Sequence, residues 1–362
     1  MRKKRRSIPH LLKSDGTLTK TDQEKAEVLN AQFTSVFTTE NLDNMPTLIK
    51  MPVQSELHEI TLTNEIVLKK LKKLRIDKSA GPDNVHPFLL KNFADIFSQI
   101  LTIIFTNSMN SEKLPQIWKT GVITALYKKD SRNLAENYRP ISLKSIVCKI
   151  LESIITDEIT SHLIMNNLLN VNQHGFTKGK STVTNLITAL NIWTESLSHG
   201  IPIDVIYLDF SKAFDKVPHQ RLVNQLYNFG ISGKCLSWIQ NFLSNRIQMV
   251  RVNDEVSQST DVKSGVPQGS VLGPTLFLIY ISQINEEILN FTSLFADDSK
   301  LFSYILESSE GHHTSKALQE DLNKLISWSE RMQMSFNLDK CHTLHLGKKI
   351  KRMNMISTIR KI

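Results

Sequence analysis

Two adjacent aspartates, Asp297 and Asp298, lie between two short apolar runs, residues 288–295 and 301–305. Both runs are rich in aromatic and branched side chains, so the pattern predicts a β-hairpin with the aspartates at its turn. Two carboxylates held side by side raise each other's pKa unless a cation sits between them. Because Asp-Asp is also ordinary turn chemistry, the pair indicates a metal site only if a third carboxylate ends another buried strand.

Asp209 is such a third carboxylate. It directly follows residues 203–208, a nearly continuous apolar run that is typical of a strand covered on both faces. Three aspartates at neighbouring strand ends can hold two divalent ions about 3.5–4 Å apart, the arrangement that activates a 3′-hydroxyl and stabilises pyrophosphate in nucleotidyl transfer. Mg²⁺ suits such oxygen ligands, and we expect two Mg²⁺ ions, which Mn²⁺ can replace. A nuclease or another two-metal hydrolase can use the same carboxylates.

Residues 172–182 superficially resemble a phosphate-binding loop. Only three residues separate Gly175 from Gly179, so the GxxxxGK spacing fails and we exclude a P-loop ATPase. We expect Ser181 or Thr182 to cap the helix that follows.

A basic group and a polar loop could bind a phosphate or another ligand. Arg139 lies directly before Pro140, which holds the arginine extended and directs its guanidinium outward. With Lys128 or Lys129 near it, Arg139 can clamp a phosphate, although a surface arginine on a loop is the alternative. Residues 264–270 form a glycine-flanked polar loop that enters an apolar helix, and such a loop offers backbone N–H groups to a ligand.

Periodicity and capping signals predict the elements that position these residues. Helices are expected over residues 21–37, 63–74, 87–107, 145–163, 233–243 and 271–281, and after Pro218 as far as Gly230. Strands are expected over residues 118–127 and 246–252, and a linker over residues 38–60.

The composition favours a globular protein with a polyanionic partner. Of the 362 residues 40% are hydrophobic, which is enough for a core, and 44 Lys and Arg against 35 Asp and Glu give a net charge of +9. This excess makes nucleic acid the first candidate partner.

The sequence predicts neither secretion nor a membrane span. The basic run at residues 2–6 is not followed by an apolar segment, and the longest apolar stretch, residues 271–281, is too short to cross a bilayer. Three scattered cysteines, Cys148, Cys235 and Cys341, have no CxxC spacing, which indicates reduced thiols. We therefore expect an intracellular location, in the nucleus, the cytoplasm or both.

Taken together, these motifs resemble the reverse transcriptase domain of non-LTR retrotransposons of the jockey and chicken-repeat type, over about residues 16–347. The three catalytic motifs of that family match residues 208–215, 265–270 and 295–298. Its finger motifs match residues 78–83 and 138–143, its fourth palm motif matches residues 337–340, and Leu346-Gly347 resembles the remainder of a primer-grip hairpin.

The resemblance implies an α+β fold: a right-hand polymerase palm, built of an antiparallel sheet with packed helices, plus fingers, with the thumb largely absent. The expected parts are a basic arm, helix and linker (1–60), fingers and finger–palm connection (61–200), a palm (201–347) and a basic tail (348–362). We expect the chain to be a fragment of an element, because the 362 − 347 = 15 residues after Gly347 are too few for a thumb.

The resemblance also implies the metal ligands. Asp209 and Asp297 are expected to be the principal ligands and Asp298 a weaker third, with Phe210 included both in the ligand set and among the substrate contacts. Lys340 is the candidate acid that protonates pyrophosphate, and a surface lysine is the alternative.

Further roles concern the incoming nucleotide. Arg139 and one of Lys128 and Lys129 are expected to grip the triphosphate. Phe214, five residues after Asp209, is expected to lie under the sugar and to exclude a ribose 2′-hydroxyl, which makes the product DNA.

Gln268 and Gly269 are expected to meet the template and the nucleotide. Neither Phe214 nor this loop has a task in a hydrolase, so the resemblance favours an RNA-directed DNA polymerase that uses an RNA template, a DNA primer or target, and dNTPs. The alternative is a truncated, weak or inactive copy that only binds nucleic acid.

Overall fold

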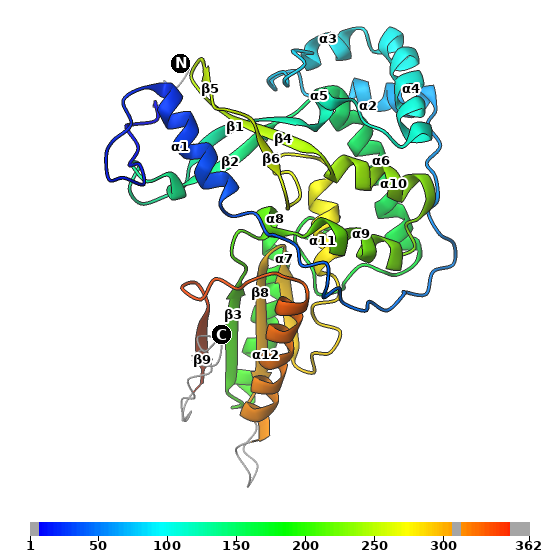
Figure 1. Ribbon diagram of the computed structural model, residues 1–362. Helices are drawn as coiled ribbons and strands as arrows, with labels where there is room; N and C mark the ends of the chain where they lie inside the picture. Colours follow the sequence, from blue (N-terminus) through cyan, green and yellow to red (C-terminus); the bar gives the residue numbers. More distant parts are fainter. Residues whose placement is uncertain (1–6, 306–312, 348–362) are drawn as a thin grey trace. The chain divides into compact units, whose positions relative to one another are not determined.

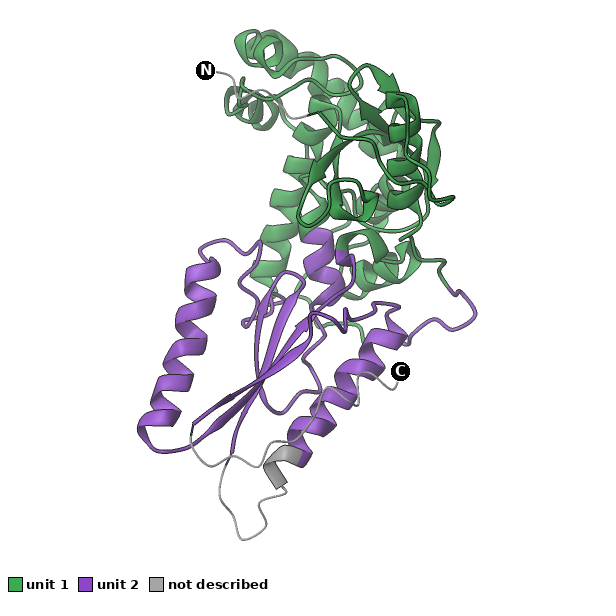
Figure 2. Ribbon diagram, turned by 90° about the vertical axis from the view of Figure 1, so that its left-hand side faces the viewer, with its two compact units in different colours: residues 1–40, 49–166, 214–274 green, residues 41–48, 167–213, 275–362 purple. Residues whose placement is uncertain are grey.

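The computed structural model describes residues 7–305 and 313–347, and the chain divides into two compact units (Figures 1 and 2). Unit 1 comprises residues 1–40, 49–166 and 214–274, and unit 2 comprises residues 41–48, 167–213 and 275–362. Each unit is built around its own sheet, so the predicted α+β class is confirmed. The four-part division into arm, fingers, palm and tail stays a prediction, and the basic run 2–6 and the tail 348–362 lie outside the described residues.

Unit 1 contains a five-stranded sheet in the order β2-β1-β4-β5, with β6 also paired to β4. All pairs are antiparallel except β1 with β4. The strands are β1 (Thr120–Tyr127), β2 (Tyr138–Leu143), β4 (Arg246–Val252), β5 (Glu255–Val256) and β6 (Thr260–Val262).

Unit 1 also contains helices. They are α1 (Asp22–Thr34), α2 (Asn64–Lys72), α3 (Pro87–Asn92), α4 (Ala94–Ser111), α5 (Gln116–Lys119), α6 (Ile146–Met165), α9 (His219–Asn228) and α10 (Gly233–Leu243), with a 3-10 turn, η1 (Ala135–Asn137). The chain passes from one unit to the other within α8 (Ala213–Lys216) and α11 (Gly273–Ile281).

Local signals explain most of these boundaries. The Thr21 hydroxyl accepts the N–H of Glu24 at the start of α1, and α1 packs its buried Leu29 and Phe33 against the sheet of unit 1. The helix expected over residues 87–107 is wrong as one piece. It is divided into α3 and α4 because Phe93 leaves helical geometry, with φ −112° and ψ 33°.

Unit 2 contains an antiparallel sheet in the order β7-β8-β3-β9, covered by α7 on one face and α12 on the other (Figure 2). An antiparallel sheet with packed helices is the arrangement predicted for the palm. The elements are β3 (Ile203–Asp209), β7 (Phe291–Phe295), β8 (Asp298–Tyr304), β9 (His342–Leu346), α7 (Thr182–Ser198) and α12 (His313–Arg331).

The central strand β3 is buried on both faces, as its apolar sequence predicts. Ile203 and Val205 pack with Phe302 of β8 and with Trp193 of α7. The alternate residues of β3 point to the opposite face, which α12 covers.

Two further predictions can be compared with the described residues. The three cysteines are free and buried. Within residues 7–305 and 313–347, no helix is long and apolar enough to span a bilayer.

Replacing Phe302 with Ala is expected to lower the free energy of unfolding by about 3–5 kcal/mol, because the ring is only 1% exposed and lies against Trp193 and Phe291. Denaturant unfolding followed by tryptophan fluorescence measures the change. Leu289→Ala, at a side chain that is 82% exposed, is the matched control and should change the free energy by less than about 0.5 kcal/mol. Equal losses for the two variants would contradict the packing described for unit 2.

Candidate active site

The register of β3 and β8 brings two of the predicted carboxylates together. Asp209, the last residue of β3, lies directly opposite Asp298, the first residue of β8. Asp297 lies beside them in the turn that joins β7 to β8. The predicted hairpin is therefore confirmed, but its turn consists of Ala296 and Asp297, and Asp298 already belongs to the strand.

The three carboxylates repel one another, and two lysines offset this repulsion. Burial and the charges of Asp297 and Asp209 raise the pKa of Asp298, whereas Lys340 and Lys300 lower it. Lys340 Nζ donates to both carboxylate oxygens of Asp209, at 2.8 and 2.6 Å. Lys340 thus lies at the site where the sequence places it, as the direct counter-charge of Asp209.

A cavity of about 610 Å³ opens beside these groups in unit 2. Its lining combines carboxylates, lysines and aromatic rings from α7, β3, β7, β8, β9 and the residues just before β9. Among the lining residues are Asn185, Tyr207, Asp209, Asp298, Lys300, Lys340 and His342. Because Tyr207 and His342 stack with ring centroids 4.6 Å apart, the cavity has one rigid aromatic wall.

The side chain of Phe210 is buried, whereas a substrate contact is expected to be accessible. Its ring is 2% exposed and stacks on Phe336, with centroids 4.5 Å apart. The main chain on either side of Phe210 is also held: Ser211 N–H donates to Ser335, and Asn337 N–H donates to Asp209. A ligand can therefore meet Phe210 only through main-chain atoms.

The donor chemistry of this edge suits a hard divalent cation, because every candidate side-chain ligand is a carboxylate. In the described part of the chain, however, no three His, Cys, Asp or Glu side chains converge closely enough to hold a metal ion. A cation at Asp209 would have to displace the ammonium group of Lys340 or share the Asp209 carboxylate with it.

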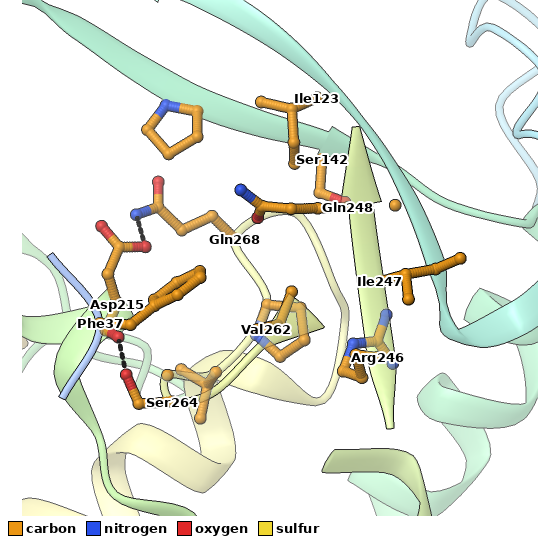
Figure 3. A pocket seen from close by; sticks show the side chains of 15 residues that line it. Phe37, Ile123, Ser142, Asp215, Arg246, Ile247, Gln248, Val262, Ser264 and Gln268 are labelled. Atoms are coloured by element: carbon orange, nitrogen blue, oxygen red, sulfur yellow. Dashed lines mark hydrogen bonds between the residues drawn. The ribbon is translucent and has the colours of Figure 1, made fainter. Parts of the chain in front are cut away.

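In unit 1, the loop that carries Gln268 is hydrogen-bonded to Asp215, the last residue of the first motif, in α8 (Figure 3). Gln268 Nε2 donates to Asp215 Oδ1 at 2.7 Å, and Figure 3 shows the amide oxygen directed away from that carboxylate. The N–H of Ser142 in β2 donates to the Gln268 carbonyl at 3.1 Å. Both the main chain and the side chain of Gln268 are therefore fixed.

Two glycines permit this close approach. Gly265 has φ +90°, and a Cβ there would lie 2.7 Å from the carbonyl oxygens of Phe214 and Asp215. Gly269 has φ +95°, and a Cβ there would lie 2.8 Å from the Ser142 carbonyl oxygen. Only glycine fits such positions without strain.

The far end of the same loop is held by a buried ion pair. Glu152 accepts the N–H groups of Val271 and Leu272 at 2.7 and 3.2 Å, and Lys144 Nζ lies 3.5 Å from its other oxygen. Both charged side chains are fully buried, and burial lowers the pKa of Lys144 to about 8.

The predicted phosphate-binding residues lie on the β1–β2 hairpin of unit 1. Arg139 is exposed on β2 opposite Leu126, and the Lys128 N–H pairs with Asn137 one step beyond the strand ends. By the alternation of a strand, Arg139 and Lys128 share one face. Lys129 lies in the bend after β1 and pairs with Asp130 at 3.3 Å.

The structure thus forms two sets of predicted site residues, each within its own unit. Unit 2 holds Asp209, Phe210, Asp297, Asp298 and Lys340, and unit 1 holds Arg139, Lys128, Lys129, Phe214, Gln268 and Gly269.

Sequence reasoning missed Lys300 and its partner Asn185. Lys300 Nζ donates to Asn185 Oδ1 at 2.7 Å, and its charge lowers the pKa of Asp298. The available signal was the period of two along β8, which places Lys300 on the same face as Asp298. No comparable signal pointed to Asn185.

The profile of the family described as Reverse transcriptase (RNA-dependent DNA polymerase) matches residues 126–356, which is more than half of the chain. Similar proteins of Drosophila melanogaster include the probable RNA-directed DNA polymerase from transposon BS, 27% identical over 91% of this chain, and the RNA-directed DNA polymerase from mobile element jockey, 26% identical over 89%. The chain spans 38% and 36% of the lengths of these two relatives.

Among solved structures, an apo telomerase from Candida tropicalis, truncated from its C-terminal domain, aligns with a TM-score of 0.46 and 14% identity, over 70% of this chain and 56% of that one. The relatives from mobile elements confirm the resemblance stated from the motifs. Because the family profile covers the second and third catalytic motifs as well as the first, the chain belongs to the reverse transcriptase family.

Proposed function

We propose that this chain is a polymerase module that adds dNTPs to the 3′-hydroxyl of a DNA primer paired with an RNA template. The observation that carries the proposal is the register of β3 and β8, which sets Asp209 against Asp298 with Asp297 in the adjoining turn. The choice of reaction is supported by the relatives, whose names describe RNA-directed DNA polymerases.

In the proposed mechanism, Asp209, Asp297 and Asp298 would hold two Mg²⁺ ions. When bound, the ions supply activation of the primer hydroxyl and charge neutralisation on the leaving pyrophosphate. Lys340 would leave Asp209 in the cation-bound site, and its ammonium group would then be available as the acid that protonates pyrophosphate.

The residues of unit 1 would bind and select the nucleotide. Arg139 and Lys128, on one face of the β1–β2 hairpin, supply cationic donors for the triphosphate. Phe214 excludes the 2′-hydroxyl of a ribonucleotide by contact. Gln268, whose amide nitrogen is bound to Asp215, presents its amide oxygen to the template or the nucleotide.

One observation favours a second candidate function, nucleic-acid binding without polymerisation. Lys340 neutralises Asp209 in the described structure, and the carboxylates do not converge on a common point. With a net charge of +9, the chain would then bind nucleic acid in a strongly salt-dependent way that is indifferent to Asp297. The experiment on Asp297 distinguishes the two functions.

Asp297→Asn is expected to lower primer extension on an RNA template with dNTPs by about 100-fold or more, because it removes one negative charge from the cation site. Affinity for the primer–template, measured by fluorescence anisotropy, should change little. Asp95→Asn, at an aspartate whose side chain is 79% exposed in unit 1, serves as the control and should leave extension unchanged. If the wild-type chain binds primer–template but extends no primer with Mg²⁺ or Mn²⁺, the binding function replaces the polymerase function.

Phe214→Ala is expected to reduce the preference for dNTPs over rNTPs by about 10-fold or more, because the ribose 2′-hydroxyl would no longer meet the ring. Single-nucleotide addition with dGTP and with GTP gives the ratio of the two kcat/KM values. An unchanged ratio in an active variant would show that another residue selects the sugar.

Asp298→Asn is expected to raise the melting temperature at pH 7 by about 2 °C or more in the absence of divalent cations, because it removes one of three mutually repelling charges. Addition of MnCl₂ should stabilise the wild-type chain more than the variant, since a cation that binds the folded state raises its stability. Differential scanning calorimetry with and without MnCl₂ measures both effects. A lower melting temperature for the variant would refute the repulsion argument.

A further inference from the structure

Residues 172–175 lie along the outer edge of β7 in unit 2. Leu294 N–H donates to the Asn172 carbonyl at 2.9 Å, and His174 N–H donates to the Leu294 carbonyl at 2.9 Å. This pairing, a parallel bridge between Gln173 and Leu294, holds the segment beside the strand that enters the catalytic turn.

The Gln173 side chain extends from this segment into the turn itself. Gln173 is 4% exposed, and its Oε1 accepts the Ala296 N–H at 2.8 Å and the Gly175 N–H at 2.7 Å. One buried amide oxygen thus joins the main chain next to Asp297 to the main chain of the supporting segment.

Ala296 needs such support because it has φ +53°. A residue with a Cβ in the left-handed region is strained and persists only where the surroundings over-determine its conformation. Without the Gln173 acceptor, the buried Ala296 N–H would also be left unsatisfied, which would destabilise the turn further.

Gly175 holds the turn from the same side. A Cβ at Gly175 would lie 2.3 Å from the Ala296 nitrogen, so the segment can approach the turn only with glycine there. The φ angle of Gly175 is not positive, so glycine is required there only by the close approach to Ala296.

We propose that Gln173 is a positioning residue for the reaction: its amide oxygen fixes the main chain of the turn Ala296-Asp297 and thereby places the Asp297 carboxylate against Asp209. The inference rests on the proposed polymerase function. It gives a role to residues 172–175, the start of the segment whose glycine spacing does not fit a phosphate-binding loop.

Two variants disturb this contact in different ways. Gln173→Met keeps the length of the side chain and removes the acceptor, whereas Gly175→Ala keeps the acceptor and pushes against Ala296. Gln319→Met is the matched control, because Gln319 bonds Asn323 along the surface of α12. Phe302→Ala controls for lost stability, since it weakens the core of unit 2 without touching the turn.

Hydrogen exchange at the Ala296 amide is the readout that does not depend on activity. We expect slow exchange in the wild-type chain and in Gln319→Met, and exchange at least about 10-fold faster in Gln173→Met. In single-nucleotide addition, kcat should fall by about 10-fold or more in Gln173→Met and Gly175→Ala, with primer–template affinity within about two-fold of wild type. The Mn²⁺ concentration for half-maximal activity should rise in both variants. Below its melting temperature, Phe302→Ala should show neither the fall in kcat nor the change in Mn²⁺ dependence.

Equal exchange at Ala296 in Gln173→Met and in the wild-type chain would overturn the inference. So would faster exchange with unchanged kcat and Mn²⁺ dependence, or a matching loss of kcat in Phe302→Ala. An inactive wild-type chain whose Ala296 amide is still exposed by Gln173→Met would support the contact and overturn the polymerase proposal, so the two failures are distinguishable.

Discussion

Unit 2 has to hold three mutually repelling carboxylates together at one edge of its sheet. Asp209 and Asp298 are direct cross-strand partners, and like charges in that position destabilise a sheet. The register survives because β3 is buried on both faces, so a slip by one residue would exchange the side chains that fit against α7 for those that fit the opposite face. Core packing thus holds the carboxylates together, and Lys340 and Lys300 offset part of their charge.

The loop of unit 1 is also held in an unfavourable geometry by specific contacts, and here glycines permit the close approach of the main chain. Gly265 and Gly269 let the loop contact main-chain oxygens that any side chain would displace. Gln268 is then held by Asp215 through its amide and by Ser142 through its carbonyl. The buried Glu152 closes the far end of the loop, and its desolvation is compensated by two N–H groups and by Lys144. These contacts fix the orientation of the Gln268 side chain, which we propose meets the template or the nucleotide.

Much of this arrangement could be predicted from sequence because its signals are local. The helix over residues 233–243 and the strand over residues 246–252 have the predicted bounds, and Ser181 caps α7 as expected. The ion pair of Lys340 with Asp209 joins residues 131 positions apart, and no periodicity or capping rule reports such a pairing. The burial of Phe210 was missed for a related reason: the ring stacks on Phe336, which follows α12 and is separated from Phe210 by the strands β4 to β8.

The turn at Asp297 shows why the supporting residues are harder to find than the reacting ones. A carboxylate at a strand end can be recognised in the sequence by its residue type. The role of the neutral Gln173 is visible only in the structure, from the backbone groups that it binds. Ala296 in the left-handed region is a local conflict between sequence and structure, and such conflicts gather where function requires a fixed geometry. The repulsive carboxylates and the strained alanine both favour relaxation of the turn, so the geometry needs a contact that opposes them. The buried amide of Gln173 and the missing Cβ of Gly175 supply that opposition from a segment 123 residues away from the turn.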